Sequence, residues 1–312
     1  MDTAPLTTTR GERLAPAPPS ALIVLSLAVA VLAAAAASVG LLATGGPGPH
    51  AVDGLRGPTD LYGTGLYRFD TWLIGSGNRG TDAAVLVAEV PLLLTALHWA
   101  RRGRSAGQWL LAASLGFFTY YYGSMCTATA YNRFFLVYVA LFAMSAFALV
   151  LALRLVVAGD DAPVTLTFDF PARAVTVYLF AVAAVLTFVW LPPPLGALLS
   201  GDPPELVATY TTGVTWAIDL GIIVPLVVVA AAQLHRRTSL GFRLATYVVL
   251  LNVTIGVSLL GQGAAQLLED APLTPGERVG AIGGFAVLTF CSIGLALKIL
   301  RGMQEPRMIG QS

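Results

Sequence analysis

Charged residues are scarce in this 312-residue sequence. Only 11% of its residues are Asp, Glu, Lys or Arg, and 56% are hydrophobic, whereas a soluble globular domain carries about 25% charged residues. A soluble chain this apolar could not cover its surface with polar groups, which favours lipid as its solvent. The net charge of +1 provides no basic footprint, so we expect no nucleic-acid partner.

Signatures of chemistry are equally scarce. The two cysteines, Cys126 and Cys291, have neither a CxxC nor a metal-ligand spacing, so we expect two small buried apolar residues and no disulfide. His98 and His235 each close an apolar run near an arginine pair, where they are interpreted as surface anchors and not as metal ligands. No nucleophile–base pair or nucleotide-binding loop stands out, and the cofactor, if any, is unknown.

Long apolar runs, in contrast, are abundant. Each is close to the 17–25 residues that a helix needs to cross about 30 Å of hydrocarbon. The sequence therefore predicts an all-α, polytopic membrane helix bundle of about eight transmembrane helices. Their expected ranges are 21–43, 81–99, 108–129, 134–157, 173–191, 209–234, 243–267 and 279–300. The second and third are the weakest, because Glu89, Pro91 and a polar stretch from Tyr120 interrupt them.

Little of the chain lies outside these runs. Residues 1–20 are polar and rich in Pro and Thr, which is typical of disorder, and residues 301–312 form a tail. The first run exceeds the 7–15 apolar residues of a signal peptide, which favours an uncleaved helix over that alternative. In the connection 44–80, the stretch DLYGTGLYRFDTWLIGSG is interpreted as an interfacial or re-entrant segment, or else as a loop with an aromatic anchor.

The basic residues predict the orientation. If the N-terminus is cytoplasmic, thirteen basic residues fall on the cytoplasmic side and five outside, as the positive-inside rule requires. The thirteen are Arg10, Arg13, Arg101, Arg102, Arg104, Arg154, Arg173, Arg236, Arg237, Arg243, Lys298, Arg301 and Arg307, and the five are Arg56, Arg68, Arg79, Arg133 and Arg278. We therefore expect a multi-pass protein of the cell membrane with both termini in the cytoplasm.

Two stretches of the sequence resemble each other. Each runs from an acid, Asp82 or Asp219, through Val-Pro-Leu to Leu-His and a pair of arginines. Because both helices are expected to run inward, the match indicates two parallel four-helix halves, a repeat type found in transporters. The spacings do not match without gaps, and chance similarity between apolar helices is the alternative.

The stretches DAAVLVAEVPLLL, AYNRFFLVYVALFAMSAFAL and AIDLGIIVPLVVV resemble an uncharacterised family of prokaryotic multi-pass membrane proteins. The resemblance covers most of the chain after the first apolar run. It implies the multi-pass architecture and no particular chemistry.

Acidic residues inside the predicted helices are the main functional candidates. Glu89 lies about 10 Å and Asp219 about 15 Å into its helix. Ionisable groups at such depths cost about 2.5–3.5 kcal/mol and normally face a bundle interior or a wet cavity. Asp82 lies two turns before Glu89 on the same helix face, so these two carboxylates could line one path.

Two prolines support a site at these acids. Pro91 and Pro225 cannot donate to the carbonyls of Val87 and Gly221, and a carboxylate beside a freed carbonyl could bind a cation or a proton. The alternative is a carboxylate, protonated or paired with Arg, that only fixes helix packing.

The predicted outer half of the bundle is rich in tyrosine. Tyr121 falls there, at the level of Arg68, Asp70, Asn132 and Arg133, which hints at an outward-facing pocket. An aromatic belt at the interface is the alternative. Elsewhere, Gln262 and Gln266 lie one turn apart and could hydrogen-bond across the bundle.

Three functions remain open from the sequence. The first is a transporter of a small solute, coupled to a proton or cation through Glu89 and Asp219. The second is a non-catalytic subunit, sensor or assembly factor with a membrane-protein partner. The third is a membrane enzyme acting on a lipid-linked substrate at the outer face, with Asp70, Asp82, Arg68 and Arg133.

Overall fold

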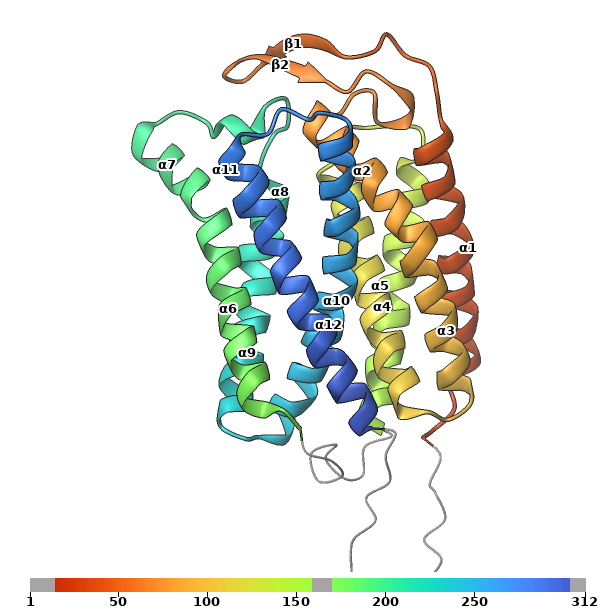
Figure 1. Ribbon diagram of the computed structural model, residues 1–312. Coiled ribbons are helices and arrows are strands. Elements are labelled where there is room, and N and C mark those ends of the chain that lie inside the picture. Colours follow the sequence, from red (N-terminus) through yellow and green to blue (C-terminus); the bar gives the residue numbers. More distant parts are fainter. Residues whose placement is uncertain (1–14, 159–169, 304–312) are drawn as a thin grey trace, which may run out of the picture.

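A computed structural model describes residues 15–158 and 170–303 and confirms an all-α polytopic bundle (Figure 1). Seven helical segments in these ranges are long and apolar enough to cross a membrane, so the chain is an integral membrane protein whose solvent is a lipid bilayer. The segments are α1 (Ser20–Leu42), α2 to α3 (Trp72–Arg101), α5 (Phe135–Ala158), α6 to α7 (Ala172–Ser200), α8 to α9 (Val214–His235), α10 (Ser239–Leu268) and a last segment that ends with α12 (Arg278–Gly302).

Helix α4 (Ser105–Thr127) is an eighth long helix of the bundle, although it is not apolar enough to be counted with the other seven. It runs alongside its neighbours (Figure 1) and packs against α3, α5 and α10. Fifteen of its 23 residues are buried, whereas only 28% of the most apolar stretch of α5 is buried. A helix enclosed by protein needs few lipid-facing apolar side chains, which explains why its apolar signal is weak in the sequence.

The second spanning segment begins nine residues before its predicted start at Thr81. It consists of α2 (Trp72–Ala84), a π-helical turn η2 (Val85–Glu89) and α3 (Val90–Arg101). The hydroxyl of Thr71 caps the first turn by accepting a hydrogen bond from the Ile74 N–H (3.4 Å). The apolar pattern missed this start because the first turns contain Gly, Asn, Arg and Asp.

The connection before α2 is a folded cap and not a re-entrant segment. Strands β1 (His50–Gly54) and β2 (Gly57–Leu61) form an antiparallel hairpin, followed by a 3-10 turn, η1 (Gly65–Tyr67). The hairpin lies across one end of the bundle (Figure 1), called here the hairpin end. The stretch expected to be interfacial or re-entrant thus divides between β2, this turn and the start of α2.

The second half of the chain contains the remaining elements. The sixth spanning helix begins at Val214 and not near residue 209. The fifth, seventh and eighth agree with their predicted ranges to within a few residues, except that α7 extends the fifth segment to Ser200. The remaining elements are α6 (Ala172–Trp190), α7 (Pro192–Ser200), η4 (Glu205–Val207), α8 (Val214–Ile218), η5 (Asp219–Ile223), α9 (Val224–His235), α11 (Pro275–Glu277), η6 (Arg278–Gly283) and α12 (Gly284–Gly302).

The two halves of the bundle have the same order of neighbours. In the first half, α1 contacts α2 and α3, α3 contacts α4, α4 contacts α5, and α5 closes the ring on α1. In the second half, α6 contacts α9, α9 contacts α10, α10 contacts α12, and α12 closes the ring on α6. This matching order supports two parallel four-helix halves.

A π-helical turn marks the same place in both halves. Val90 and Val224 each precede a proline, and their N–H groups donate to the carbonyls of Val85 and Asp219, five residues earlier. Such a wide turn accommodates a proline that cannot donate to the residue four positions back. The common register is therefore 134 residues, from Val90 to Val224.

This register continues without gaps into the next helix. The buried positions of α3, Leu93, Ala96, Leu97 and Ala100, correspond to the buried Val227, Ala230, Ala231 and Leu234 of α9. The turns that follow both have a positive φ, at Gly103 (70°) and Arg237 (57°). The sequence pattern needs gaps because it pairs Asp82 with Asp219 and His98 with His235, whereas the register of the π-helical turns pairs Val85 with Asp219.

The halves meet where α10 packs against α2 and α4. Gly80 of α2 and Gly261 of α10 bring the two backbones together, since a Cβ atom on either glycine would collide with the carbonyl of the other. The counterpart of this α2–α10 pair, α8 with α4, has few contacts. The pseudo-symmetry is thus broken between one tight and one loose interface.

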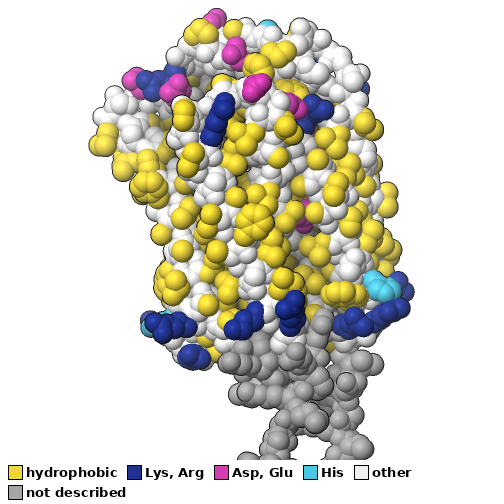
Figure 2. All heavy atoms as spheres, viewed as in Figure 1, with side chains coloured by type: hydrophobic (Ala, Val, Ile, Leu, Met, Phe, Trp, Pro, Cys, Tyr) yellow, Lys and Arg dark blue, Asp and Glu magenta, His cyan; other side chains and the backbone are white. Residues whose placement is uncertain are grey.

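Charge is distributed unequally between the two ends. The end opposite the hairpin, called here the basic end, carries no acidic residue among those described, and dark-blue side chains gather there in Figure 2. Its basic residues are Arg101, Arg102, Arg104, Arg154, Arg173, Arg236, Arg237, Arg243, Lys298 and Arg301. Helix α1 begins and α12 ends at this end (Figure 1), as an even number of crossings requires.

We expect the basic end to face the cytoplasm, because arginine and lysine are retained on that side. Reporters fused after Arg104, after Arg237 and at the C-terminus should score as cytoplasmic, and reporters inserted near Pro47, Asp202 or Asp270 as external. An external C-terminus would contradict this orientation.

Gly80→Ala should lower the melting temperature in detergent. The added methyl group would push α2 away from α10, and overpacking of this kind costs about 1–3 kcal/mol. Gly294→Ala in α12 is the control, because a Cβ atom there meets nothing within 4 Å, so it should be neutral or slightly stabilising. Equal effects of the two substitutions would mean that the close approach at Gly80 is unimportant.

Candidate functional site

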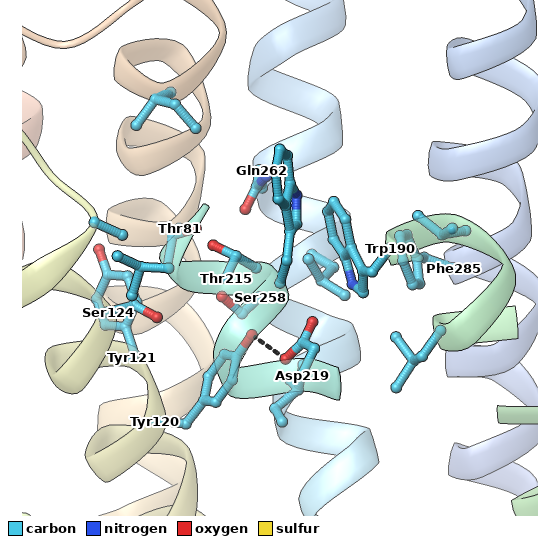
Figure 3. A pocket seen from close by; sticks show the side chains of 18 of the residues that line it. Thr81, Tyr120, Tyr121, Ser124, Trp190, Thr215, Asp219, Ser258, Gln262 and Phe285 are labelled. Atoms are coloured by element: carbon cyan, nitrogen blue, oxygen red, sulfur yellow. Dashed lines mark hydrogen bonds between the residues drawn. The ribbon is translucent and has the colours of Figure 1, made fainter. Parts of the chain in front are cut away.

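A cavity of about 510 Å³ lies between the two halves, at the loose α8–α4 interface (Figure 3). Helices α2 and α4 of the first half and α6, α8, α10 and α12 of the second contribute to its wall. Most lining side chains are aromatic or aliphatic, with hydroxyl and amide groups between them. The volume and the mixed lining are those of a small-molecule site.

Asp219 is the only acidic residue among the described residues that line the cavity, and no Lys, Arg or His lines it with Asp219. It is the first residue of the π-helical turn η5 and is 6% exposed. The Tyr120 hydroxyl donates to its Oδ1 (3.0 Å), and the indole of Trp190 lies on its other side (Figure 3). The carboxylate therefore has only neutral groups beside it, the Tyr120 hydroxyl and the Trp190 indole, and no counter-charge in the described lining of the cavity.

The cavity also holds polar groups whose hydrogen bonds are incomplete. Trp190 Nε1 and Asn78 Nδ2 are buried without a hydrogen-bond partner among the described residues, and both residues line the cavity. An unsatisfied buried donor costs about 1–3 kcal/mol. Two such donors in a cavity that also holds the Asp219 carboxylate are what a site prepared for a polar ligand or ordered water would show.

Other amides close the walls. Asn252 donates to the Tyr178 hydroxyl (3.4 Å), which in turn donates to the Leu288 carbonyl (3.3 Å). Gln266 donates across the bundle to the Leu73 carbonyl (3.0 Å), which agrees with the expectation for this residue, whereas Gln262 lines the cavity (Figure 3). These bonds join α6, α10, α12 and α2 around the space.

Asp82 is buried next to the cavity but satisfied by protein groups. Its Oδ2 accepts from the Tyr67 hydroxyl (2.7 Å) and its Oδ1 from the Tyr121 hydroxyl (3.3 Å). Gly40 of α1 leaves room for the carboxyl group, because a Cβ atom there would collide with it. The hydrogen bonds of Asp82 therefore hold the packing of the bundle. Its partner Tyr121 lines the cavity and so connects Asp82 with the cavity.

Glu89 occupies a different place from Asp219. It is the last residue of η2 and is 1% exposed, and its Oε2 has no hydrogen-bond partner among the described residues. Both acids face the protein interior, as the cost of lipid exposure requires. Neither Glu89 nor Asp82 is among the residues that line the cavity, so the structure does not bring these two onto the shared path that was expected.

Asp70 links the two halves at the hairpin end. Its Oδ1 accepts from the Ala130 N–H (2.7 Å) in the first half and from the Tyr210 hydroxyl (2.8 Å) in the second. Tyr210 also accepts from the Thr71 N–H (3.3 Å), and Thr71 and Tyr210 line the cavity. Burial raises the pKa of Asp70 to about 7, against the opposing effect of the hydrogen bonds from Ala130 and Tyr210.

The remaining sequence candidates lie away from the cavity. Arg68 is exposed and stacks over the Phe69 ring (4.7 Å), and Arg133 is exposed as well. Asn132 caps the chain before α5 by accepting from the Phe134 N–H (2.9 Å). The structure therefore does not assemble Asp70, Asp82, Arg68 and Arg133 around one space, as an enzyme at this face would need.

Several lining residues carried no signal in the sequence. Trp190, Trp216 and Phe285 belong to three different helices, and no local pattern shows that they face one cavity. Asn78 was missed because the start of α2 was placed after it. The cysteines and histidines are not part of the site: His98 and His235 are exposed at the basic end, and Cys291 is exposed and not buried as expected.

Comparison with known protein families, with curated proteins and with solved structures finds no match to this chain. The resemblance to an uncharacterised family of prokaryotic membrane proteins stays a prediction.

Asp70 should make the stability of the fold depend on pH. Because its pKa is about 7 in the folded protein and about 3.9 when unfolded, the folded state binds the proton more tightly. The contribution of Asp70 to the free energy of unfolding is therefore full at low pH. It is lost as the pH rises to about 7, and the loss is at most about 4 kcal/mol.

Asp70→Asn should remove this loss, since the amide keeps an acceptor for Ala130 and Tyr210 and has no charge. The variant should melt at a higher temperature than wild type at pH 8, with a smaller difference at pH 5. Asp60→Asn on the exposed hairpin is the control and should follow wild type. An identical pH profile for Asp70→Asn and wild type would contradict the assignment.

Proposed function

We propose that the protein is a membrane carrier for a small organic solute, which binds in the cavity between its two halves with Asp219 as the main polar anchor. The observation that carries this proposal is the 510 Å³ space at the loosely packed interface of a two-part bundle. Substrate sites of repeat-built transporters lie at the interface of their repeats, near the middle of the membrane.

The packing suggests which parts would move. The α2–α10 contact at Gly80 and Gly261 brings two backbones together and would act as the pivot. The α8–α4 interface has few contacts and would open and close over the cavity. At the hairpin end, the hydrogen bonds of Asp70 to Ala130 and Tyr210 join the halves and would have to break for outward access.

The orientation belongs to the same proposal. With the basic end in the cytoplasm of the cell membrane, the Asp70 closure lies on the external side. The geometry gives no further support to proton or cation coupling through Glu89. It also gives none to a role as a non-catalytic subunit of a membrane-protein complex. Both become outcomes of the test.

Ser124→Trp should abolish uptake of the solute, because the indole would fill the cavity that Ser124 lines. The assay is accumulation of a panel of small organic solutes in proteoliposomes, with and without a pH gradient. Thr127→Trp is the control on the same helix, since Thr127 is exposed and does not line the cavity, and it should transport like wild type.

Two results would count against a carrier. If wild type accumulates no solute of the panel above empty liposomes, the subunit role is favoured instead. If Ser124→Trp transports like Thr127→Trp, the solute does not pass through this cavity. Melting curves of both variants show whether each is folded.

A further inference from the structure

We infer that the solute is an organic cation with an apolar body, whose charged group pairs with Asp219. The inference depends on the proposed role of the cavity as a binding site and specifies the chemistry of its ligand. It follows from the charge, the aromatic content and the size of the cavity.

The charge balance of the cavity favours a cation. Asp219 is 6% exposed and accepts one hydrogen bond from a neutral hydroxyl, that of Tyr120. Within the described lining there is no basic residue to pair with it. Arg79, on the neighbouring α2, is already occupied by Glu269 (2.8 Å) and Tyr62 (2.7 Å). An ionised buried carboxylate without a counter-charge is costly, and a positively charged ligand would supply that charge.

The aromatic side chains around Asp219 suit a diffuse positive charge. Tyr120 and Trp190 flank the carboxylate in Figure 3, and Phe285 and Trp216 also line the cavity. Aromatic faces attract ammonium groups, by about 0.5–1 kcal/mol at exposed sites and about 2 kcal/mol or more when water is excluded. A carboxylate combined with several rings is the usual surrounding of an alkylammonium ion.

The rest of the cavity suits an apolar body. Its volume of about 510 Å³ lies in the range of small-molecule sites, and aliphatic residues such as Leu186, Ile223 and Leu259 complete the wall. Gln262 lies one turn beyond Ser258 on α10, about 6 Å nearer the hairpin end, where it and Asn78 could hydrogen-bond a polar group of the ligand.

Two other ligand classes fit less well. An anion would meet Asp219 without any basic residue among the described lining. A metal ion would have one carboxylate only, because no group of three His, Cys, Asp or Glu residues in the described chain could hold it, and Ca²⁺ requires six to eight oxygen ligands. A neutral apolar solute is the remaining competitor.

A pair of ligands of equal shape separates the cation from this competitor. Phenyltrimethylammonium and tert-butylbenzene differ in one atom, the positively charged nitrogen that replaces a carbon. Binding of each to the full-length protein in nanodiscs is measured by thermal stabilisation over a range of ligand concentrations. The cation should bind wild type at least tenfold more tightly than its neutral counterpart.

Asp219→Asn should abolish this preference, because the amide keeps an acceptor for Tyr120 but has no charge. Glu89→Gln is the matched control: it also neutralises a buried acid, but one that does not line the cavity, so the preference for the cation should stay at its wild-type value. Trp190→Leu provides a second test if Asp219→Asn does not fold, and it should weaken the cation several-fold more than tert-butylbenzene.

The outcomes distinguish this inference from the proposed function. Equal binding of the two ligands by wild type, no binding of the cation, or an undiminished preference in Asp219→Asn would overturn the inference. The same holds if Trp190→Leu weakens both ligands equally. A carrier of neutral solutes would survive these results if Ser124→Trp still blocked uptake, whereas failure of that variant to block uptake would refute the proposed function itself.

Discussion

The cost of placing a carboxylate in a medium without water governs the interior of this protein. A carboxyl group there is stabilised by partners within the chain, by a bound ligand or by taking up a proton. Asp82 finds two tyrosine hydroxyls, and Asp70 a backbone N–H and a tyrosine hydroxyl. Asp219 has the Tyr120 hydroxyl, the nearby Trp190 indole and an adjoining cavity. The first two acids hold helices together, whereas the incomplete surroundings of Asp219 leave room for a ligand.

The prolines explain how the backbone arrives at this arrangement. Pro91 and Pro225 each follow a π-helical turn, and such turns often occur at functional sites. Val85 in the first half and Asp219 in the second occupy equivalent positions, each as the first residue of its π-helical turn. An apolar side chain at that position is compatible with the tight α2–α10 packing, whereas the acid adjoins the loose α8–α4 interface. In the proposed carrier, one repeat would thus provide the pivot and the other the site.

Sequence reasoning reached the architecture because apolar runs and basic flanks are local signals. It placed Asp219 and Tyr121 among the candidates, and both line the cavity. It could not find the start of α2, since that helix is stabilised by the cap at Thr71 and by glycine packing on α10 and not by its own hydropathy. Nor could it show that Trp190 approaches Asp219, which depends on how helices far apart in the sequence are packed.

In the proposed carrier, the closure at the hairpin end would connect proton binding with movement of the halves. Asp70 precedes the first helix of the pivot, and its hydrogen-bond partner Tyr210 precedes α8, which would move. Separation of the halves at this end would therefore break that bond and expose the carboxyl group of Asp70 to water, where ionisation is less costly. Loss of the proton then favours the open form and its return favours the closed form. In a carrier with this geometry, external pH biases access to the cavity without any proton having to cross the membrane with the solute.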